Sequence, residues 1–234
     1  WDCQGSVQMG EETIVCSGTH GQQDIGTAFA NSCNVAFAQI AQELGGATLK
    51  KYTEQAGLTD SYSVSGLPTA AGSFTFDGLT DGELGWAGVG QYQDLVNPAS
   101  LMVYMGAIAN GGKAAEPYLI LKTTGILGLP SLPHLTGHTG RLISAGTAET
   151  LADMMAYNVE ATYGTSRFPN MDICAKSGTA EVGADQQPHA WFAGFLRNED
   201  APYAFVVLVE NGGGGSSVAG TVAGKVLDVI VNGY

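Results

Sequence analysis

The sequence predicts an α+β fold in which an antiparallel sheet is flanked by helices. Three apolar runs late in the chain predict the sheet: residues 173–180, 189–197 and 203–210. The links between them are too short for a crossover helix, which favours successive antiparallel hairpins. Elsewhere, apolar residues recur at helical spacing between capping residues. The last run is apolar on both faces, so we expect helices to cover it on both sides.

Composition excludes several classes of function. The 234 residues suit one domain, and 44% of them are hydrophobic. The net charge is −13 with only nine Lys plus Arg, which argues against nucleic acid or an anionic lipid surface as a partner. No apolar run approaches the ~18–20 residues that span a bilayer. We expect no cofactor and no nucleic-acid partner.

Two cysteines frame the polar, glycine-rich segment 1–23, which we expect to be loop or hairpin. Cys3 and Cys16 are the candidate disulfide, and closing a loop of ~14 residues would contribute about 3 kcal/mol. Such a bond would imply an oxidising compartment. Two free thiols fit the same spacing. Cys33 and Cys174 are expected to be separate buried thiols.

The first helices meet at a polar junction. Asp24 is a good N-cap for a helix that ends near Asn31, and a second helix precedes Gly45-Gly46. Ser32 and Asn34 lie between these helices, at i and i+2, where both side chains can point into a cleft. The alternative is that one of them only caps the second helix.

The middle of the chain mixes helices with long loops. Residues 57–95 predict a surface excursion with a binding or lid role. We also expect the following elements: helices at 48–56, 97–110, about 144–161 and 218–231, and short strands at 118–124 and 141–143. His134 and His138 are flanked by proline and glycine and have no carboxylate between them, so no metal site is predicted.

Lys176 is unusual because it interrupts an apolar strand. Burying a lysine is costly, and Gly178 removes a side chain where a ligand could approach the backbone. In a strongly negative chain, this local positive charge suits a small anionic substrate. The alternative is an edge strand with a solvated lysine.

Ser32-Cys33-Asn34 followed by Lys176-Ser177-Gly178-Thr179 resembles two motifs of the penicillin-binding transpeptidase and serine β-lactamase superfamily. The resemblance covers about residues 24–231 and is closest to the class B, monofunctional D,D-transpeptidases. Other segments that resemble this family are 30–37, 90–98, 107–112, 189–195 and 209–213.

The chain departs from this family in one respect. The family's nucleophile is the serine of a Ser-x-x-Lys motif that precedes Ser-x-Asn, and residues 1–31 contain no such motif. Thr48-Leu49-Lys50-Lys51 has matching letters in the wrong place. We therefore expect residues 1–234 to be part of a transpeptidase domain, incomplete at its N-terminal side and inactive alone. The edge of the strand at 203–210 would then be open, which favours oligomers through that edge.

The resemblance implies a peptidoglycan D,D-transpeptidase and assigns roles to particular residues. Ser32 would relay a proton, and Asn34 would hydrogen-bond the acyl side chain. Lys176 and Thr179 would hold the terminal carboxylate of the stem peptide, and Ser177, Gly178 and Thr179 would bind the substrate. The N–H of Thr179 would form half of the oxyanion hole.

The same resemblance implies partners and a location. The partners would be peptidoglycan stem peptides, β-lactam antibiotics, and division or elongation proteins. The location would be the extracytoplasmic face of the bacterial membrane, with an anchor and any targeting segment upstream of Trp1. Two alternatives are a non-catalytic peptidoglycan- or β-lactam-binding sensor domain and a β-lactamase fragment. The second is disfavoured because no deacylating carboxylate can be assigned.

Strand geometry adds a constraint. Regular alternation places Lys176 and Gly178 on one face of the strand and Ser177 and Thr179 on the other. A site shared by Lys176 and Thr179 therefore predicts a backbone distortion near Gly178. Cys174 would line or underlie the cleft, or simply be a buried structural thiol.

Overall fold

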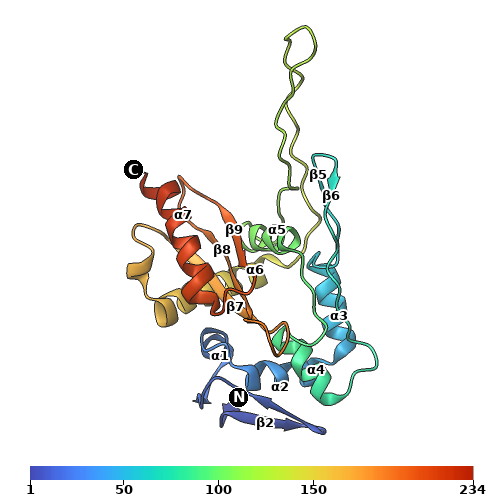
Figure 1. The fold of residues 1–234 in the computed structure, drawn as a ribbon, viewed down its shortest axis with the longest axis vertical. Helices are drawn as coiled ribbons and strands as arrows, with labels where there is room; N and C mark the ends of the chain where they lie inside the picture. The colour runs from blue at the N-terminus through green and yellow to red at the C-terminus, as the bar shows by residue number, and fades with distance from the viewer. Residues whose placement is uncertain (234) are drawn as a thin grey trace.

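The computed structural model describes residues 1–233, and it confirms an α+β architecture with an antiparallel sheet between helices (Figure 1). The strands of the main sheet are β7 (Ile173–Ala180), β8 (His189–Leu196) and β9 (Ala204–Val209). The helices are α1 (Ile25–Ala30), α2 (Asn34–Leu44), α3 (Gly46–Gln55), α4 (Asp81–Val89), α5 (Pro98–Ala109), α6 (Ala145–Asn158) and α7 (Gly220–Asn232). None of the described helices is both long and apolar enough to cross a membrane.

The remaining elements are short. They are β1 (Asp2–Cys3), β2 (Ser6–Met9), β3 (Glu12–Val15), β4 (Gly21–Gln22), β5 (Ser63–Val64), β6 (Leu67–Pro68), the π-helical turns η1 (Val159–Tyr163) and η3 (Gly215–Ala219), and the 3₁₀ turn η2 (Thr165–Arg167). β2 and β3 form a hairpin, whereas β1 pairs with β4. The loop or hairpin expected in residues 1–23 is therefore a small pair of two-stranded sheets.

The main sheet is covered on both faces, as its apolar pattern predicts. α7 packs on one face, where Ala223 and Leu227 join a cluster around Phe192. α5 and α6 pack on the other, where Met105 and Met155 join a cluster around Phe195. Figure 1 shows these helices on opposite sides of the three strands. The strand order is β7-β8-β9, so β9 pairs with β8 alone among the described residues.

Capping residues place the helices where the sequence predicts them. The Asp24 carboxylate accepts a hydrogen bond from the N–H of Thr27 at 2.8 Å and begins α1. Asn97 caps α5, and Pro98 occupies its first turn. Ser144 begins α6 in the same way.

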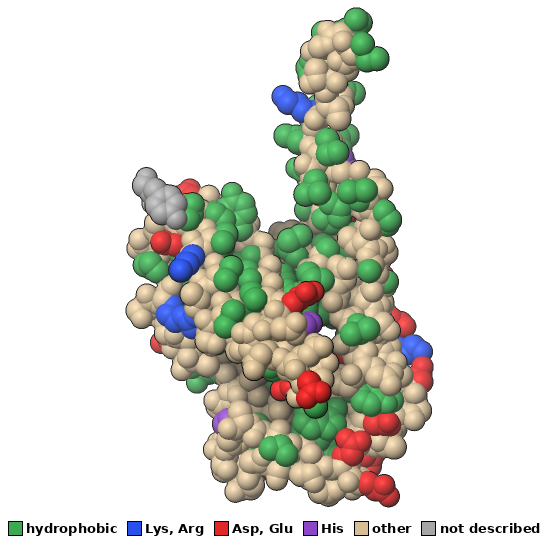
Figure 2. All heavy atoms as spheres, in the orientation of Figure 1, with side chains coloured by type: hydrophobic (Ala, Val, Ile, Leu, Met, Phe, Trp, Pro, Cys, Tyr) green, Lys and Arg blue, Asp and Glu red, His purple; other side chains and the backbone are tan. Residues whose placement is uncertain are grey.

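Two predictions about the middle of the chain are wrong. The excursion at 57–95 contains α4, which begins with a capping box formed by Thr80 and Glu83. Residues 118–124 and 141–143 form no strands. Instead, the chain between about residues 117 and 139 leaves the body as a long arm (Figure 1) with exposed aliphatic side chains (Figure 2). Apolar residues in this arm do not mark a core.

Replacing Phe192 by alanine tests the packing of the sheet. This ring is fully buried and lies 5.3–6.0 Å from the rings of Tyr163, Phe168 and Phe205. We expect Phe192→Ala to lower the free energy of unfolding by about 3–5 kcal/mol in urea denaturation. The exposed Tyr52→Ala is the matched control and should change it by less than about 0.5 kcal/mol. Equal effects of the two variants would contradict this packing.

Candidate active site

Ser32 and Lys176 are 144 positions apart in sequence and meet in the fold. The Lys176 Nζ donates a hydrogen bond to the Ser32 Oγ at 2.9 Å. It also donates to the carbonyl of Ser177 at 3.1 Å and lies 5.8 Å from the centre of the Phe29 ring, a cation–π distance. The junction between α1 and α2 and the middle of β7 therefore converge on one ammonium group.

The backbone at Ser32 is held in an unusual conformation. Its φ is +51°, in the left-handed region that costs a non-glycine residue energy. The turn is fixed because the N–H of Ser32 donates to Phe29 O at 3.1 Å and that of Cys33 donates to Ala28 O at 3.0 Å. The N-cap of α2 is Cys33, whose sulfur accepts from the N–H of Ala36. The alternative that Ser32 or Asn34 merely caps α2 is therefore wrong.

The environment of Lys176 changes its acidity. Burial lowers the pKa of the Lys176 ammonium from 10.5 to about 8 because the charged form loses solvation. A lysine with a pKa near 8 carries a substantial neutral fraction just above neutral pH. The amine can then exchange a proton with the exposed Ser32 hydroxyl.

The distortion predicted near Gly178 is absent. β7 and β8 pair in one uninterrupted register from Ile173↔Leu196 to Ala180↔His189. Regular pleating therefore places the side chain of Thr179 on the face opposite to Lys176, where its hydroxyl accepts from the N–H of Gly215 at 3.1 Å. Lys176 and Thr179 do not meet through their side chains.

Ser177 is fixed on the same face as Thr179. Its N–H and its hydroxyl both engage the phenol oxygen of Tyr163, at 2.7 and 2.8 Å. Tyr163 comes from η1, which the sequence predicted only as the end of a helix. No local signal marks this tyrosine, because its partner is a strand residue.

The backbone of Thr179 nevertheless faces the candidate site. Within residues 1–233, β7 pairs with β8 only, so its other edge is open. The Thr179 carbonyl accepts from the Gln91 side chain at 3.2 Å and therefore points to that open edge. In an antiparallel strand the N–H of a residue points to the same side as its carbonyl. The Thr179 N–H is thus positioned as a donor at the edge of β7.

Asn34 is oriented differently from the other predicted residues. Its side-chain amide donates to the carbonyl of Val15, at the end of β3, at 2.9 Å. The structure thus brings together Ser32 and Lys176 and ties Asn34 to the N-terminal hairpin. Gln91 and Gly215 were not predicted as site residues, although Gln91 lies in one of the segments that carries the family resemblance.

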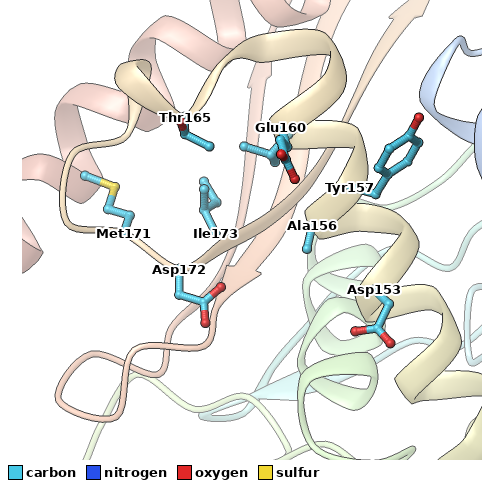
Figure 3. A pocket seen from close by; sticks show the side chains of 9 residues that line it. Asp153, Ala156, Tyr157, Glu160, Thr165, Met171, Asp172 and Ile173 are labelled. Carbon is cyan, nitrogen blue, oxygen red and sulfur yellow. The ribbon is translucent and has the colours of Figure 1, made fainter.

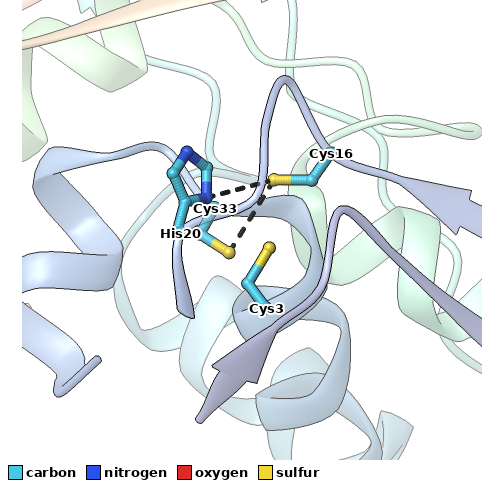
Figure 4. Close-up of side chains that lie close together, drawn as sticks. All are labelled: Cys3, Cys16, His20 and Cys33. Atoms are coloured by element: carbon cyan, nitrogen blue, oxygen red, sulfur yellow. Dashed lines mark hydrogen bonds between the residues drawn. The ribbon is translucent and has the colours of Figure 1, made fainter. Parts of the chain in front are cut away.

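The cysteines do not follow the predicted pairing. Cys3 and Cys16 are free thiols, so the structure contradicts the disulfide predicted between them. Cys33, expected to be separate, lies with its sulfur 3.8 Å from that of Cys16 (Figure 4). Cys174 is fully buried in the cluster beneath β7, and burial raises its pKa to about 11, as suits a structural thiol.

A separate hollow lies where α6 and η1 meet the start of β7 (Figure 3). Its lining residues are Asp153, Ala156, Tyr157, Val159, Glu160, Thr165, Met171, Asp172 and Ile173. The hollow excludes Ser32, Asn34 and Lys176, and Asp153 in it pairs with Arg197 at 2.8 Å. It is therefore distinct from the Ser32–Lys176 pair.

The pKa of Lys176 predicts how stability depends on pH. Its folded-state pKa of about 8 lies below the ordinary 10.5, so the unfolded chain binds more protons between these values. Stability therefore rises as the pH rises from about 8 to about 10.5. Thermal denaturation should show this rise in the wild type and a smaller rise in Lys176→Met. The exposed Lys113→Met is the control and should behave as the wild type; identical profiles for all three would contradict the shifted pKa.

Known proteins share this sequence pattern and fold. The family described as "Penicillin binding protein transpeptidase domain" matches residues 2–228. The peptidoglycan D,D-transpeptidase PbpA of Mycolicibacterium smegmatis is 32% identical over 201 residues, covering 82% of this chain and 40% of that protein. The chain thus spans less than half the length of the curated relatives it matches.

Solved structures agree with this match. The ceftriaxone acyl-enzyme of penicillin-binding protein A from M. tuberculosis has a TM-score of 0.88 and 25% identity, covering 97% of this chain and 54% of that chain. The D,D-transpeptidase domain of an Eggerthella lenta peptidoglycan glycosyltransferase also has a TM-score of 0.88, at 22% identity, covering 99% and 59%. The family match, the order of the two motifs and the fold agree: this chain belongs to the penicillin-binding protein transpeptidase domain family, class B.

Proposed function

We propose that this chain is part of a peptidoglycan D,D-transpeptidase that cross-links stem peptides and is acylated by β-lactams. The observation that carries the proposal is the 2.9 Å hydrogen bond from Lys176 Nζ to Ser32 Oγ. A hydroxyl on a strained turn, in contact with a lysine whose pKa is about 8, is a device for moving a proton. Acyl transfer to an amine requires such a device.

The nucleophile would come from a Ser-x-x-Lys segment of the same parent protein, outside residues 1–234. Its serine oxygen attacks the carbonyl of the penultimate D-Ala and forms an ester. The serine proton passes through Ser32 to the leaving amine of the terminal D-Ala as the C–N bond breaks. The amine of a second stem then attacks the ester, and its proton returns along the same route. In a β-lactam the ring amide takes the place of the D-Ala–D-Ala bond.

The substrate carboxylate would be recognised by charge. The ammonium of Lys176 stands out in a chain of net charge −13, and it attracts the terminal carboxylate of the stem. Ser177-Gly178-Thr179 would line the edge of β7 that pairs with no other described strand, and Thr179 would offer its backbone to the peptide, because the Ser177 N–H and carbonyl are already bonded to Tyr163 and Lys176. The Thr179 N–H is placed to donate to the oxyanion, because the carbonyl of the same residue faces that edge.

Asn34 can contact the acyl side chain only if its present hydrogen bonding allows it. Its amide now donates to Val15 O, so hydrogen bonding to the acyl side chain requires it to rotate or to use its free carbonyl oxygen. The predicted role remains part of the proposal on the strength of the motif. Among the described residues, Ser32 and Lys176 are the two whose contact supports it directly.

We further propose where the parent protein works and with which partners. Cross-linking substrate lies on the extracytoplasmic face of the bacterial membrane, so the parent would be held there by an anchor outside this chain. Proteins of division or elongation are the proposed partners. The edge of β9 that lacks a partner among the described residues would be covered by further strands of the parent or, in this chain alone, by a second copy.

Labelling with a fluorescent penicillin separates a transpeptidase part from a sensor domain. A longer chain of the parent that includes the Ser-x-x-Lys segment should form a covalent adduct that survives denaturation. The 234-residue chain should not label, because it lacks the nucleophile. Labelling of the short chain would refute the missing nucleophile. A longer chain that contains the motif and binds penicillin only reversibly would favour the sensor domain.

The proton relay can be tested in the same longer chain. Ser32→Ala should slow acylation by about 100- to 10,000-fold, because the proton loses its route to the leaving amine. Ser6→Ala removes an exposed hydroxyl from β2 and should leave the acylation rate unchanged. Stopped-flow acylation rates provide the comparison. A rate for Ser32→Ala equal to that of Ser6→Ala would exclude Ser32 from the relay.

A further inference from the structure

Four potential metal ligands from separate segments of the chain converge near the α1–α2 junction. Cys3 lies in β1, Cys16 follows β3, His20 precedes β4, and Cys33 caps α2. Their ligand atoms, three sulfurs and one imidazole nitrogen, all lie within 4.8 Å of one another. Figure 4 shows the four side chains pointing toward a common centre.

The spacing of these atoms matches a tetrahedral zinc site. With Zn–S bonds of about 2.3 Å and Zn–N bonds of about 2.0–2.1 Å, tetrahedral geometry separates two sulfurs by about 3.8 Å and a sulfur from a nitrogen by about 3.6 Å. The Cys16 and Cys33 sulfurs are 3.8 Å apart, and the Cys16 sulfur is 3.6 Å from His20 Nδ1. A disulfide would instead bring two sulfurs to about 2.05 Å.

We propose that Cys3, Cys16, His20 and Cys33 bind one Zn²⁺ ion in a structural Cys₃His site. Thiolate and imidazole are the ligands that zinc shares with few other biological cations, and Cys₃His is an established structural set. All four positions are filled by this chain, so the ion has no open position for water or substrate. Its role is therefore structural, and the proposal does not rest on the transpeptidase function.

Thiolates at this centre would need a cation beside them. Cys3 and Cys33 are completely buried, so their negative charges would be costly without a cation between them. The N–H of Ala36, in the first turn of α2, points to the Cys33 sulfur at 3.5 Å. This places Cys33 at the positive end of an 11-residue helix.

The N-terminal segment needs such an ion because its own core is small. β1 and β4 are two residues long and make a single short pair. The fully buried members of the cluster beneath them are small side chains (Cys3, Ala28, Cys33, Val35 and Ala36), and larger residues such as Trp1 and Phe37 pack against it only partly buried. Four coordinate bonds would join β1, the loop from Cys16 to His20 and α2 into one unit.

The proposed zinc site shares the residue Cys33 with the Ser32-Cys33-Asn34 motif. Cys33 lies between Ser32 and Asn34, and the φ of Ser32 is +51°. A metal bond to Cys33 would hold this strained turn in the position where Ser32 accepts from Lys176. Cys33 is therefore a positioning residue rather than a catalytic one.

Metal analysis and cobalt spectroscopy test the proposal on the full chain. After purification with a reductant and dialysis against zinc, we expect about one zinc per chain. Titration of metal-free protein with Co²⁺ should give tetrahedral ligand-field bands and thiolate-to-cobalt charge-transfer bands. His20→Ala and Cys16→Ser should lose zinc and weaken these bands, whereas Cys174→Ser, which removes a buried thiol elsewhere, should keep both.

Three results would overturn the proposal. One is the absence of bound zinc from the wild-type chain after this treatment. This outcome does not depend on whether any variant folds. Another is full zinc retention in both His20→Ala and Cys16→Ser. The third is a disulfide among Cys3, Cys16 and Cys33 that forms in air while zinc is present, detected as protection from alkylation. None of these measurements involves penicillin, so the result is independent of the acylation tests.

Discussion

The structure depends on holding one ammonium group between a sheet and a helix junction. Lys176 lies on β7, and its ammonium donates to the Ser32 hydroxyl and the Ser177 carbonyl and lies over the face of Phe29. None of these partners is anionic, which is why burial lowers the lysine pKa to about 8. The positive charge of Lys176 therefore has no carboxylate among these partners.

Short sequence patterns predicted most of the helices and strands, because the interactions that begin these elements lie within a few residues. Asp24, Asn97-Pro98 and Ser144 fix helix starts through contacts within one turn, and the three strands show themselves by apolar pattern. Apolar pattern failed in the arm around residues 118–124, where aliphatic side chains are exposed. The sequence analysis did not predict α4, although Thr80 and Glu83 form a capping box at its start. The glycine-rich composition around these residues favoured a loop and outweighed that signal.

The candidate site was predictable in its chemistry and only partly in its geometry. Residue type and order identified Ser32 and Lys176, and the pairing of β7 with β8 shows that the alternation argument for Thr179 was correct. The wrong step was to infer a backbone distortion near Gly178 from the requirement that the side chains of Lys176 and Thr179 share one face. An open strand edge offers its backbone instead, and residues such as Tyr163 and Gly215, which fix that edge, carry no local signal because their contacts are long-range.

Sequence spacing alone also misjudged the cysteines, for a physical reason. A pair that brackets a short loop suggests a disulfide, but a thiol can equally face two others and a histidine that arrive from distant segments. In this fold the start of α2 supplies Cys33, and the chain that leads into α2 supplies Ser32. The same turn thus faces a cluster of thiols on one side and Lys176 on the other. The Cys33 sulfur contacts the thiol cluster, and the hydroxyl of the preceding residue, Ser32, accepts from Lys176. A ligand bound to the thiols must therefore influence the orientation of Ser32 toward the lysine, because these two contacts come from adjacent residues.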